Sequence, residues 1–251
     1  MTKHPTYGSK KPRIIPRAEH NVTRAEFSKS ALKVLYRLNK AGYQAFLVGG
    51  SVRNAMLELH PKDFYVATDA TPEEVKALFG NCRLIGRRFR LAHVRFGREI
   101  IEVATFRAAA NHDDDDHHSD DEGRILRDNV YGTIDEDVWR RDFTCNSLYY
   151  NIADFSIWDY TGGFDDIKQK QIVLIGDPEM RMREDPVRML RAIRFAAKLG
   201  FDIDEAVIHA IDHHAHLLTN VPAARLFDEF LKLFQAGSAE RTFDLLRDHG
   251  L

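Results

Sequence analysis

The hydrophobic positions near the start of the chain change from helical to strand spacing. Apolar residues recur every three to four positions over 24–41, and Gly42 follows, so this segment is predicted to be a helix that ends at the glycine. The short apolar run 44–48 predicts a buried strand, which leads into Gly49-Gly50. A second helix is predicted from these glycines to about residue 59.

Strand patterns dominate the next segment. Residues 64–67 are predicted to form a strand. Over 71–79, Thr71 is a suitable N-cap, followed by proline and two acids, which predicts a short helix. Residues 91–96 and 99–106 are predicted to be two strands, joined as a hairpin by Gly97-Arg98.

The second half of the chain becomes increasingly helical. The segment 137–150 is predicted to be a helix, 155–160 a strand, 164–169 a short helix and 171–176 a strand. From residue 186 onward almost every segment has helical periodicity. The expected fold class is therefore α+β, with a mixed-sheet head followed by an all-helical region.

Composition places the chain among ordinary globular proteins. Hydrophobic residues make up 44% and charged residues 29% of 251 residues, and no stretch approaches the roughly 20 apolar residues that cross a bilayer. The N-terminus lacks the apolar region of a signal peptide. Because no such apolar stretch is present, we expect no membrane partner. Cys82 and Cys145 are too few for a disulfide framework or a zinc knuckle, so we expect the protein in a reducing cytoplasm.

The net charge of −2, from 36 basic and 38 acidic residues, conceals alternating blocks. Residues 1–17 carry bases and no acid, residues 83–107 carry seven arginines, and residues 181–198 are basic again. The stretch 113–122 holds seven acids and reads as a mobile loop. A near-neutral total therefore does not exclude a nucleic-acid partner.

We expect three regions along the chain. Residues 1–20 would form a flexible basic arm. Residues 21–176 would form the head domain. Residues 177–251 would form a helical neck and the start of a body that binds RNA or nucleotide.

The glycine pair after the first buried strand is the first candidate site. Gly49 and Gly50 would let a phosphate approach the backbone N–H groups at a helix N-terminus, and Arg53 lies one turn further on. The pattern is neither GxGxxG nor GxxxxGK[ST]. A tight turn that simply requires glycine is an equally good interpretation.

Asp63 is a candidate metal ligand near the start of the next strand. Metal-assisted phosphoryl transfer is typically supported by two carboxylates on one strand face, two residues apart. Position 65 is tyrosine in this chain. Taken alone, an aspartate in this position is more often a cap or a surface acid than a metal ligand.

The third candidate is Arg140-Arg141-Asp142. Two arginines beside an acid are suited to holding a triphosphate next to a carboxylate. The alternative interpretation is a surface turn held by salt bridges.

The fourth candidate is a charged helix face. Arginine recurs every third residue, at Arg188, Arg191 and Arg194. Asp185 lies three residues before Arg188. An aspartate beside an arginine matches the donor and acceptor edge of adenine or cytosine. A solvated helix face explains the same pattern.

Two histidine groups resemble metal sites. His112, His117 and His118 surround an acidic run, and His213, His214 and His216 lie close together near the C-terminus. Neither group has a defined ligand spacing. We interpret the first group as loop and the second as helix surface.

These motifs, in this order, resemble the class II nucleotidyltransferases of the polymerase-β superfamily. The family pattern LVGGxVRDxLLGxxPKDFDxxTxATPE is matched by residues 47–73, LVGGSVRNAMLELHPKDFYVATDATPE. The blocks CRLIGRRFRLAHVRFG, EIIEVATFR, RRDFTCNSLYY and REDPVRMLRAIRFAAKLGF resemble the bacterial poly(A) polymerase branch. The CCA-adding branch, which extends tRNA, shares the GG, RRD and EDxxR motifs.

The resemblance implies a polymerase-β-like head that adds AMP from ATP to RNA 3′ ends, with Mg²⁺ as cofactor and RNA as partner. The residues that it assigns to nucleotide binding are Gly49, Gly50, Arg53, Arg141, Asp185, Arg188, Arg191 and Arg194. The residues that it assigns to catalysis are Asp63, which is also the metal ligand, and Asp142, with Glu102 as a further candidate acid.

The chain departs from the family pattern at four neighbouring positions. Tyr65 replaces the second metal aspartate, Asn54 and Glu58 replace an aspartate and a glycine, and Ser51 follows the glycine pair. Losing one metal ligand predicts a much slower reaction. Three functions stay open: an impaired adenylyltransferase, a CCA-adding enzyme, and a catalytically degenerate paralogue that binds RNA or nucleotide.

Overall fold

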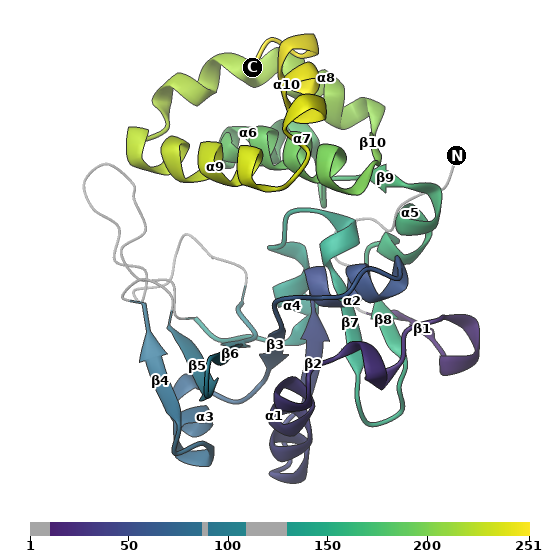
Figure 1. Ribbon diagram of the computed structural model, residues 1–251, viewed down its shortest axis with the longest axis vertical. Helices are drawn as coiled ribbons and strands as arrows, with labels where there is room; N and C mark the ends of the chain where they lie inside the picture. The colour runs from purple at the N-terminus through teal and green to yellow at the C-terminus, as the bar shows by residue number, and fades with distance from the viewer. Residues whose placement is uncertain (1–10, 87–89, 109–129) are drawn as a thin grey trace. The chain divides into compact units, whose positions relative to one another are not determined.

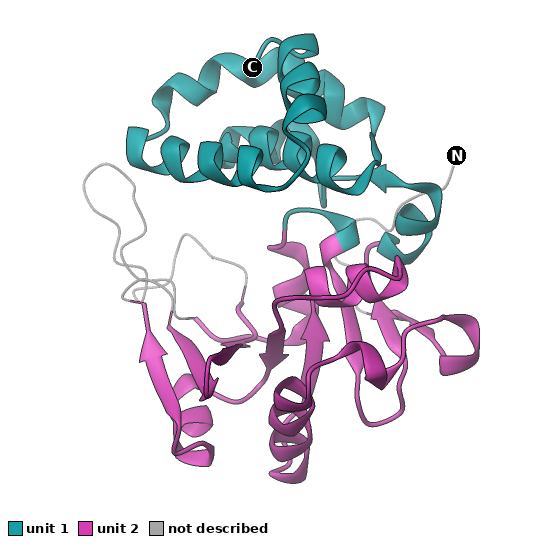
Figure 2. Cartoon of the chain, in the orientation of Figure 1, with its two compact units in different colours: residues 1–7, 142–145, 162–251 teal, residues 8–141, 146–161 magenta. Residues whose placement is uncertain are grey.

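The computed structural model describes residues 11–86, 90–108 and 130–251 (Figure 1). The chain divides into two compact units (Figure 2). Unit 1 contains residues 142–145 and 162–251, and unit 2 contains residues 8–141 and 146–161.

Unit 2 is built on an eight-stranded mixed sheet with the order β1-β8-β7-β2-β3-β6-β5-β4. Its strands are β1 Arg13–Ile15, β2 Ala45–Val48, β3 Tyr65–Thr68, β4 Cys82–Ile85, β5 Leu91–Phe96, β6 Glu99–Thr105, β7 Leu148–Asn151 and β8 Ile157–Asp159. Strands β3 and β6 are parallel, and the other neighbouring pairs are antiparallel. The mixed sheet confirms the expected fold class.

Two helices of unit 2 start where local capping chemistry allows. Helix α1, Lys29–Lys40, begins after Ser28, whose side chain accepts the N–H of Ala31. Helix α3, Pro72–Leu78, begins with a capping box between Thr71 and Glu74. Helix α1 contacts β2, β3 and β6, whereas α3 contacts β4, β5 and β6. The remaining helical segments of this unit are α2 Gly50–Met56, α4 Ile134–Trp139, and the 3₁₀ turns Arg17–Glu19 and Arg24–Glu26. A further 3₁₀ turn, Thr144–Asn146, begins in residues of unit 1 and ends at the first residue with which unit 2 resumes.

A hydrophobic cluster joins α4 to the sheet. It contains Phe46 and Val48 of β2, Tyr149 of β7 and Val138 of α4, all at most 3% exposed. Helix α4 begins at another capping box, between Thr133 and Glu136. This cluster places the central strand β2 between buried neighbours, so the strand end at Val48 is held in a fixed position.

The structure differs from the sequence predictions in four segments of unit 2. The helix predicted over 137–150 is wrong: α4 ends at Trp139, and the tyrosine-rich Leu148–Asn151 forms a central strand, β7, because aromatic residues suit a buried strand. The helix predicted over 24–41 starts only at Lys29. Strand β4 was not predicted. Residues 13–15, expected in a flexible arm, pair with β8.

Unit 1 is mostly helical, as predicted. Its helices are α5 Gly163–Gln169, α6 Pro178–Glu184, α7 Val187–Leu199, α8 Glu205–His214, α9 Ala223–Gln235 and α10 Ala239–Asp248, with a 3₁₀ turn at Ala215–Asn220. Helix α7 contacts α6, α9 and α10. The strand predicted over 171–176 shortens to β9, Gln171–Ile172, which pairs in parallel with β10, Asp202–Ile203.

The residues 162–176, expected in the head, cluster with unit 1. Strand β9 pairs with β10 of the helical region. Gly163, at the start of α5, lies against the chain at Thr144, since a Cβ atom there would meet the Thr144 carbonyl oxygen at 2.1 Å. The Thr144 hydroxyl also donates to Asp166 at 2.6 Å. These contacts place α5 and β9 with residues 142–145 in unit 1.

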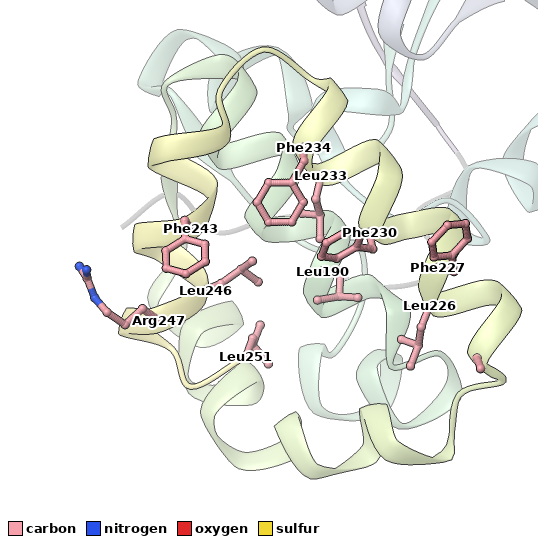
Figure 3. A pocket seen from close by; sticks show the side chains of 11 residues that line it. Leu190, Leu226, Phe227, Phe230, Leu233, Phe234, Phe243, Leu246, Arg247 and Leu251 are labelled. Atoms are coloured by element: carbon pink, nitrogen blue, oxygen red, sulfur yellow. The ribbon is translucent and has the colours of Figure 1, made fainter.

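An apolar hollow of about 850 Å³ lies between helices of unit 1 (Figure 3). Phe227, Phe230 and Phe243 line it and are 53–61% exposed. Arg247 is the one charged residue of its lining. This hollow lacks the converging polar groups that a phosphoryl-transfer site requires. None of the helices in residues 11–86, 90–108 and 130–251 combines the length and apolar character needed to cross a bilayer.

Candidate active site

The glycine turn connects the buried strand β2 to α2. Gly49 has φ 79° and ψ −139°, a backbone conformation that a side chain would strain. Gly50 is the first residue of α2, and the carbonyl of Gly49 accepts the N–H of Arg53 at 3.2 Å. The predicted strand–glycine–helix unit is confirmed as a local structure.

Arg53 lies beneath this turn and is only 3% exposed. Its Nε and Nη2 donate to Asn54 Oδ1 at 3.1 and 2.9 Å, and its Nη1 donates to Asn146 Oδ1. A Cβ atom on Gly50 would lie 3.3 Å from Nη2 of Arg53. The guanidinium therefore supports the turn from inside the unit. The absence of a side chain at Gly50 leaves the space that the guanidinium occupies.

Helix α2 ends in a Schellman motif. The N–H of Leu59 donates to the carbonyl of Asn54 at 2.8 Å, and the N–H of Glu58 donates to that of Ala55 at 3.2 Å. Glu58 has φ 57°, the left-handed conformation that glycine adopts most easily. Glutamate therefore stands in a backbone conformation that favours glycine, at the position where the family pattern has glycine.

Asp63, Tyr65 and Glu102 form one group at the end of β2, which we call the carboxylate edge. Val48, the last residue of β2, pairs with Tyr65, so the glycine turn and Asp63 lie at the same end of these antiparallel strands. Tyr65 also pairs with Glu102 on β6, and side chains two apart on a strand share a face. The carboxylates of Asp63 and Glu102 make no hydrogen bond or ion pair with any residue that the structure describes.

Tyr65 is 43% exposed at the centre of this edge. Partial burial raises the pKa of its hydroxyl, and the negative charges of Glu102 and Asp63 raise it further. The phenol therefore stays protonated at neutral pH. It cannot replace the anionic ligand that an aspartate would supply.

The RRD motif has one arginine in a buried network of unit 2. Arg141 donates to Asp137 Oδ2 at 2.7 Å and to the Tyr149 hydroxyl at 2.7 Å, and that hydroxyl donates to Asp137 at 2.8 Å. Burial would raise the pKa of Asp137, but Arg141 and Tyr149 bring it below its usual value. Arg140 donates to the carbonyl of Ala108 at 2.7 Å. This network supports the fold around β7.

The acid of the RRD motif belongs to unit 1. Asp142 Oδ2 accepts from Arg191 of α7 through Nε, at 2.9 Å, and through Nη2. Asp142 Oδ1 accepts the N–H of Phe143 at 2.8 Å. Asp142 therefore forms a partly buried ion pair with α7. This differs from the alternative interpretation of the motif, a surface turn held by salt bridges.

We call Asp185, Arg188, Arg191 and Arg194 the arginine face of α7. Asp185 accepts from Arg225 of α9 at 2.7 Å. Arg188 donates to Glu184 at 3.0 Å and to the carbonyl of Arg181. Arg194 lies 3.7 Å from Glu229. Each member therefore has a charged partner inside unit 1.

The structure brings together only part of the predicted set. Gly49, Gly50, Asp63 and Glu102 lie at one end of the sheet in unit 2, whereas Asp142 and the arginine face belong to unit 1. Sequence reasoning missed three partners of the predicted site residues. They are Asn146, which bonds Arg53, Arg225, which bonds Asp185, and Glu229, which lies beside Arg194. Asn146 follows the RRD motif within the same block, which was the available signal. No motif marked Arg225 or Glu229.

Two family models match the chain. One, described as the Poly A polymerase head domain, matches residues 45–173. The other, described as the probable RNA and SrmB-binding site of polymerase A, matches residues 200–251.

Similar proteins are found in two branches. The poly(A) polymerase I of Salmonella typhimurium is 56% identical over 95% of this chain and 52% of its own length. The CCA-adding enzyme of Bacillus velezensis is 37% identical over 90% of this chain and 55% of its own length. The chain spans about half the length of the curated relatives it matches.

Solved structures agree with this placement. The CCA-adding enzyme of Bacillus stearothermophilus in complex with CTP has a TM-score of 0.74 and 31% identity, covering 89% of this chain and 52% of that one. A tRNA nucleotidyltransferase complexed with a primer tRNA and an ATP analogue has a TM-score of 0.69 and 27% identity, covering 86% of this chain and 60% of that one. The head-domain match covers more than half of the residues, and this chain therefore belongs to the poly(A) polymerase head-domain family of nucleotidyltransferases.

Proposed function

We propose that this chain transfers AMP from ATP to RNA 3′ ends and releases pyrophosphate, as a polynucleotide adenylyltransferase. The 56% identity to a poly(A) polymerase I, against 37% to a CCA-adding enzyme, supports adenylate addition over CCA addition. The match of residues 200–251 to a probable RNA-binding region supports RNA as the acceptor. The compartment that we propose is the reducing cytoplasm.

The observation that carries the proposal is the shared position of the glycine turn and the carboxylate edge. The pairing of Val48 with Tyr65 brings the turn and Asp63 to the same end of the sheet. Backbone N–H groups at Gly49 and Gly50 would hold the phosphates, because no side chain blocks their approach. Arg53 would act indirectly, by bracing the turn through Asn54 and Asn146.

Asp63 and Glu102 are the residues that would hold Mg²⁺. Two carboxylates with no protein partner among the described residues are the oxygen donors that Mg²⁺ prefers. The ion would neutralise charge on the transferring phosphoryl group. A protonated Tyr65 adds no charge to this set, so we expect a slow enzyme.

Base selection would come from the arginine face. Asp185 would accept from the adenine amino group and Arg188 would donate to the neighbouring ring nitrogen. Arg191 and Arg194 would lie near the phosphates, and Asp142, now bonded to Arg191, would serve as the remaining acid. Since these groups already have partners, nucleotide binding would exchange ion pairs.

A primer-extension assay tests the proposal. The purified chain is incubated with an RNA primer and each of the four nucleotides, with and without Mg²⁺. We expect extension with ATP alone, and only with Mg²⁺. Comparable incorporation of CTP would instead show a CCA-adding activity.

Tyr65 favours a second candidate, a paralogue that binds nucleotide or RNA without catalysis. In that case Tyr65→Asp combined with Asn54→Asp creates Mg²⁺-dependent extension where the parent chain has none. Tyr65→Phe is the matched control, because it removes the hydroxyl without adding a carboxylate. Robust extension by the unaltered chain would exclude this candidate.

A further inference from the structure

A group of metal-ligand side chains lies in unit 1, on α6 and α8, and shares no residue with the arginine face. His209 and His213 are four residues apart on α8, so they project from the same side of the helix. Their ring centroids are 4.8 Å apart. Glu179 of α6 brings a carboxylate to them, with Oε1 3.2 Å from Nδ1 of His209. One ligand atom from each of the three residues lies within 4.8 Å of the others.

The carboxylate of Glu179 is held in place by a second interaction. His214, 9% exposed at its side chain, contacts Oε2 of Glu179 through Nε2 at 2.5 Å. The other oxygen therefore faces His209. Arg183 lies 3.8 Å from Oε2 on the same helix. An outer group that orients a ligating carboxylate is a feature of natural metal sites.

The distances suit a tetrahedral ion of the size of zinc. Zinc binds imidazole nitrogen and carboxylate oxygen at about 2.0–2.2 Å, which puts neighbouring ligand atoms roughly 3.3 Å apart. The His209–Glu179 distance of 3.2 Å already matches this spacing. His213 is exposed, so a change of rotamer can bring its nitrogen to the third position without disturbing the core.

The ligand types select the kind of ion. Imidazole nitrogen suits Zn²⁺ and its neighbours, whereas Mg²⁺ prefers oxygen and keeps its waters. We propose that Glu179, His209 and His213 bind a zinc ion that joins α6 to α8. Three protein ligands leave a fourth position for water. Since α6 ends at Glu184, directly before Asp185, the ion also stabilises the helix that leads into the arginine face.

The test is zinc binding by the metal-free full chain, measured by calorimetry and by thermal unfolding. We expect one equivalent of Zn²⁺ to bind, with a rise in melting temperature of about 5–10 °C when zinc is at roughly 100 times its Kd. Mg²⁺ at the same concentration is expected to give no such rise. His209→Ala and His213→Ala should each weaken zinc binding about tenfold or more.

His216→Ala is the matched control. It removes another exposed histidine that follows α8, outside the proposed ligand set, and should leave the zinc affinity unchanged. Because both ligand histidines are exposed, the metal-free variants should melt as the parent does. Should a variant melt lower, Glu179→Gln provides an independent removal of a ligand. Zinc binding that persists unchanged in His209→Ala and His213→Ala, or no binding by the parent chain, would overturn the proposal.

Discussion

In unit 2 the carboxylates of Asp63 and Glu102 lie at the end of the sheet and engage no other described side chain. In unit 1 the carboxylates of Asp142 and Asp185 each accept from an arginine. The first arrangement contributes little to folding but leaves charge available to an ion. The second stabilises the helical unit, and its charges are available to a nucleotide only after ion pairs are exchanged.

Removing the charge at the carboxylate edge should give the largest effect on activity. Asp63→Asn keeps the size of the side chain, so we expect a loss of about 100-fold or more in the rate of primer extension. Its stability should stay within about 0.5 kcal/mol of the parent, because Asp63 is exposed. Asp202→Asn, at an exposed acid of unit 1, is the control. A loss below tenfold would argue against a metal ligand at Asp63.

Removing the buried carboxylate of Asp137 in unit 2 should, in contrast to Asp63→Asn, lower the stability of the protein. Asp137→Ala leaves Arg141 without its carboxylate partner, and we expect a cost of about 3 kcal/mol in unfolding free energy. The pKa of Asp137 is lowered in the folded state, so its contribution is complete above the unfolded-state value of about 3.9. That contribution is lost as pH falls through the lower folded value. Unfolding of both proteins from pH 7 to pH 2 should therefore show their difference shrinking in acid; a constant difference would contradict this.

The paired charges of unit 1 should give a smaller effect on stability. We expect Asp142→Asn and Arg191→Met each to cost about 1–2 kcal/mol, because the pair is partly buried. The double variant should cost less than the sum of the two single variants. Denaturant unfolding of all four proteins measures this coupling. A coupling energy near zero would show that the pair contributes nothing.

The end of α2 should give the smallest effect, and of opposite sign. Glu58→Gly relieves a left-handed backbone angle of 57°, and we expect a gain of about 1 kcal/mol in stability. Glu58→Ala keeps the strain and serves as the control. Equal melting of the two variants would show that the angle stores no strain.

Many local elements of the fold could be predicted from the sequence. The N-cap at Thr71 and the hairpin at Gly97-Arg98 are determined by neighbouring residues, and both form as predicted. Residues 140–150 were wrongly predicted to continue a helix. Their apolar spacing did not show that residues 148–151 would form β7, buried between β2 and β8. That burial depends on partners far away in the chain.

The candidate site was predictable only as a set of residue types. The motifs identified Asp63, Arg53 and Asp185, but their spacing did not reveal what each side chain contacts. Arg53 turned out to lie under the glycine turn, and Asp185 to bond Arg225, because tertiary packing decides which side chains meet. Of the proposed zinc ligands, only His213 belongs to a histidine group that the sequence pattern marks. His209 lies four residues earlier on α8 and was not marked, and Glu179 reaches both histidines only through the packing of α6 on α8.

The strand order has a consequence for how this chain folds as it is synthesised. Strands β1 and β2 come from the start of unit 2, but their neighbours β8 and β7 come from its end. Until residues 148–159 have left the ribosome, one edge of β2 stays unpaired and exposed to wrong partners. Pairing across so much chain is also slow. We therefore expect the nascent chain to be prone to aggregation until β7 pairs with β2 and β8 then pairs with β7.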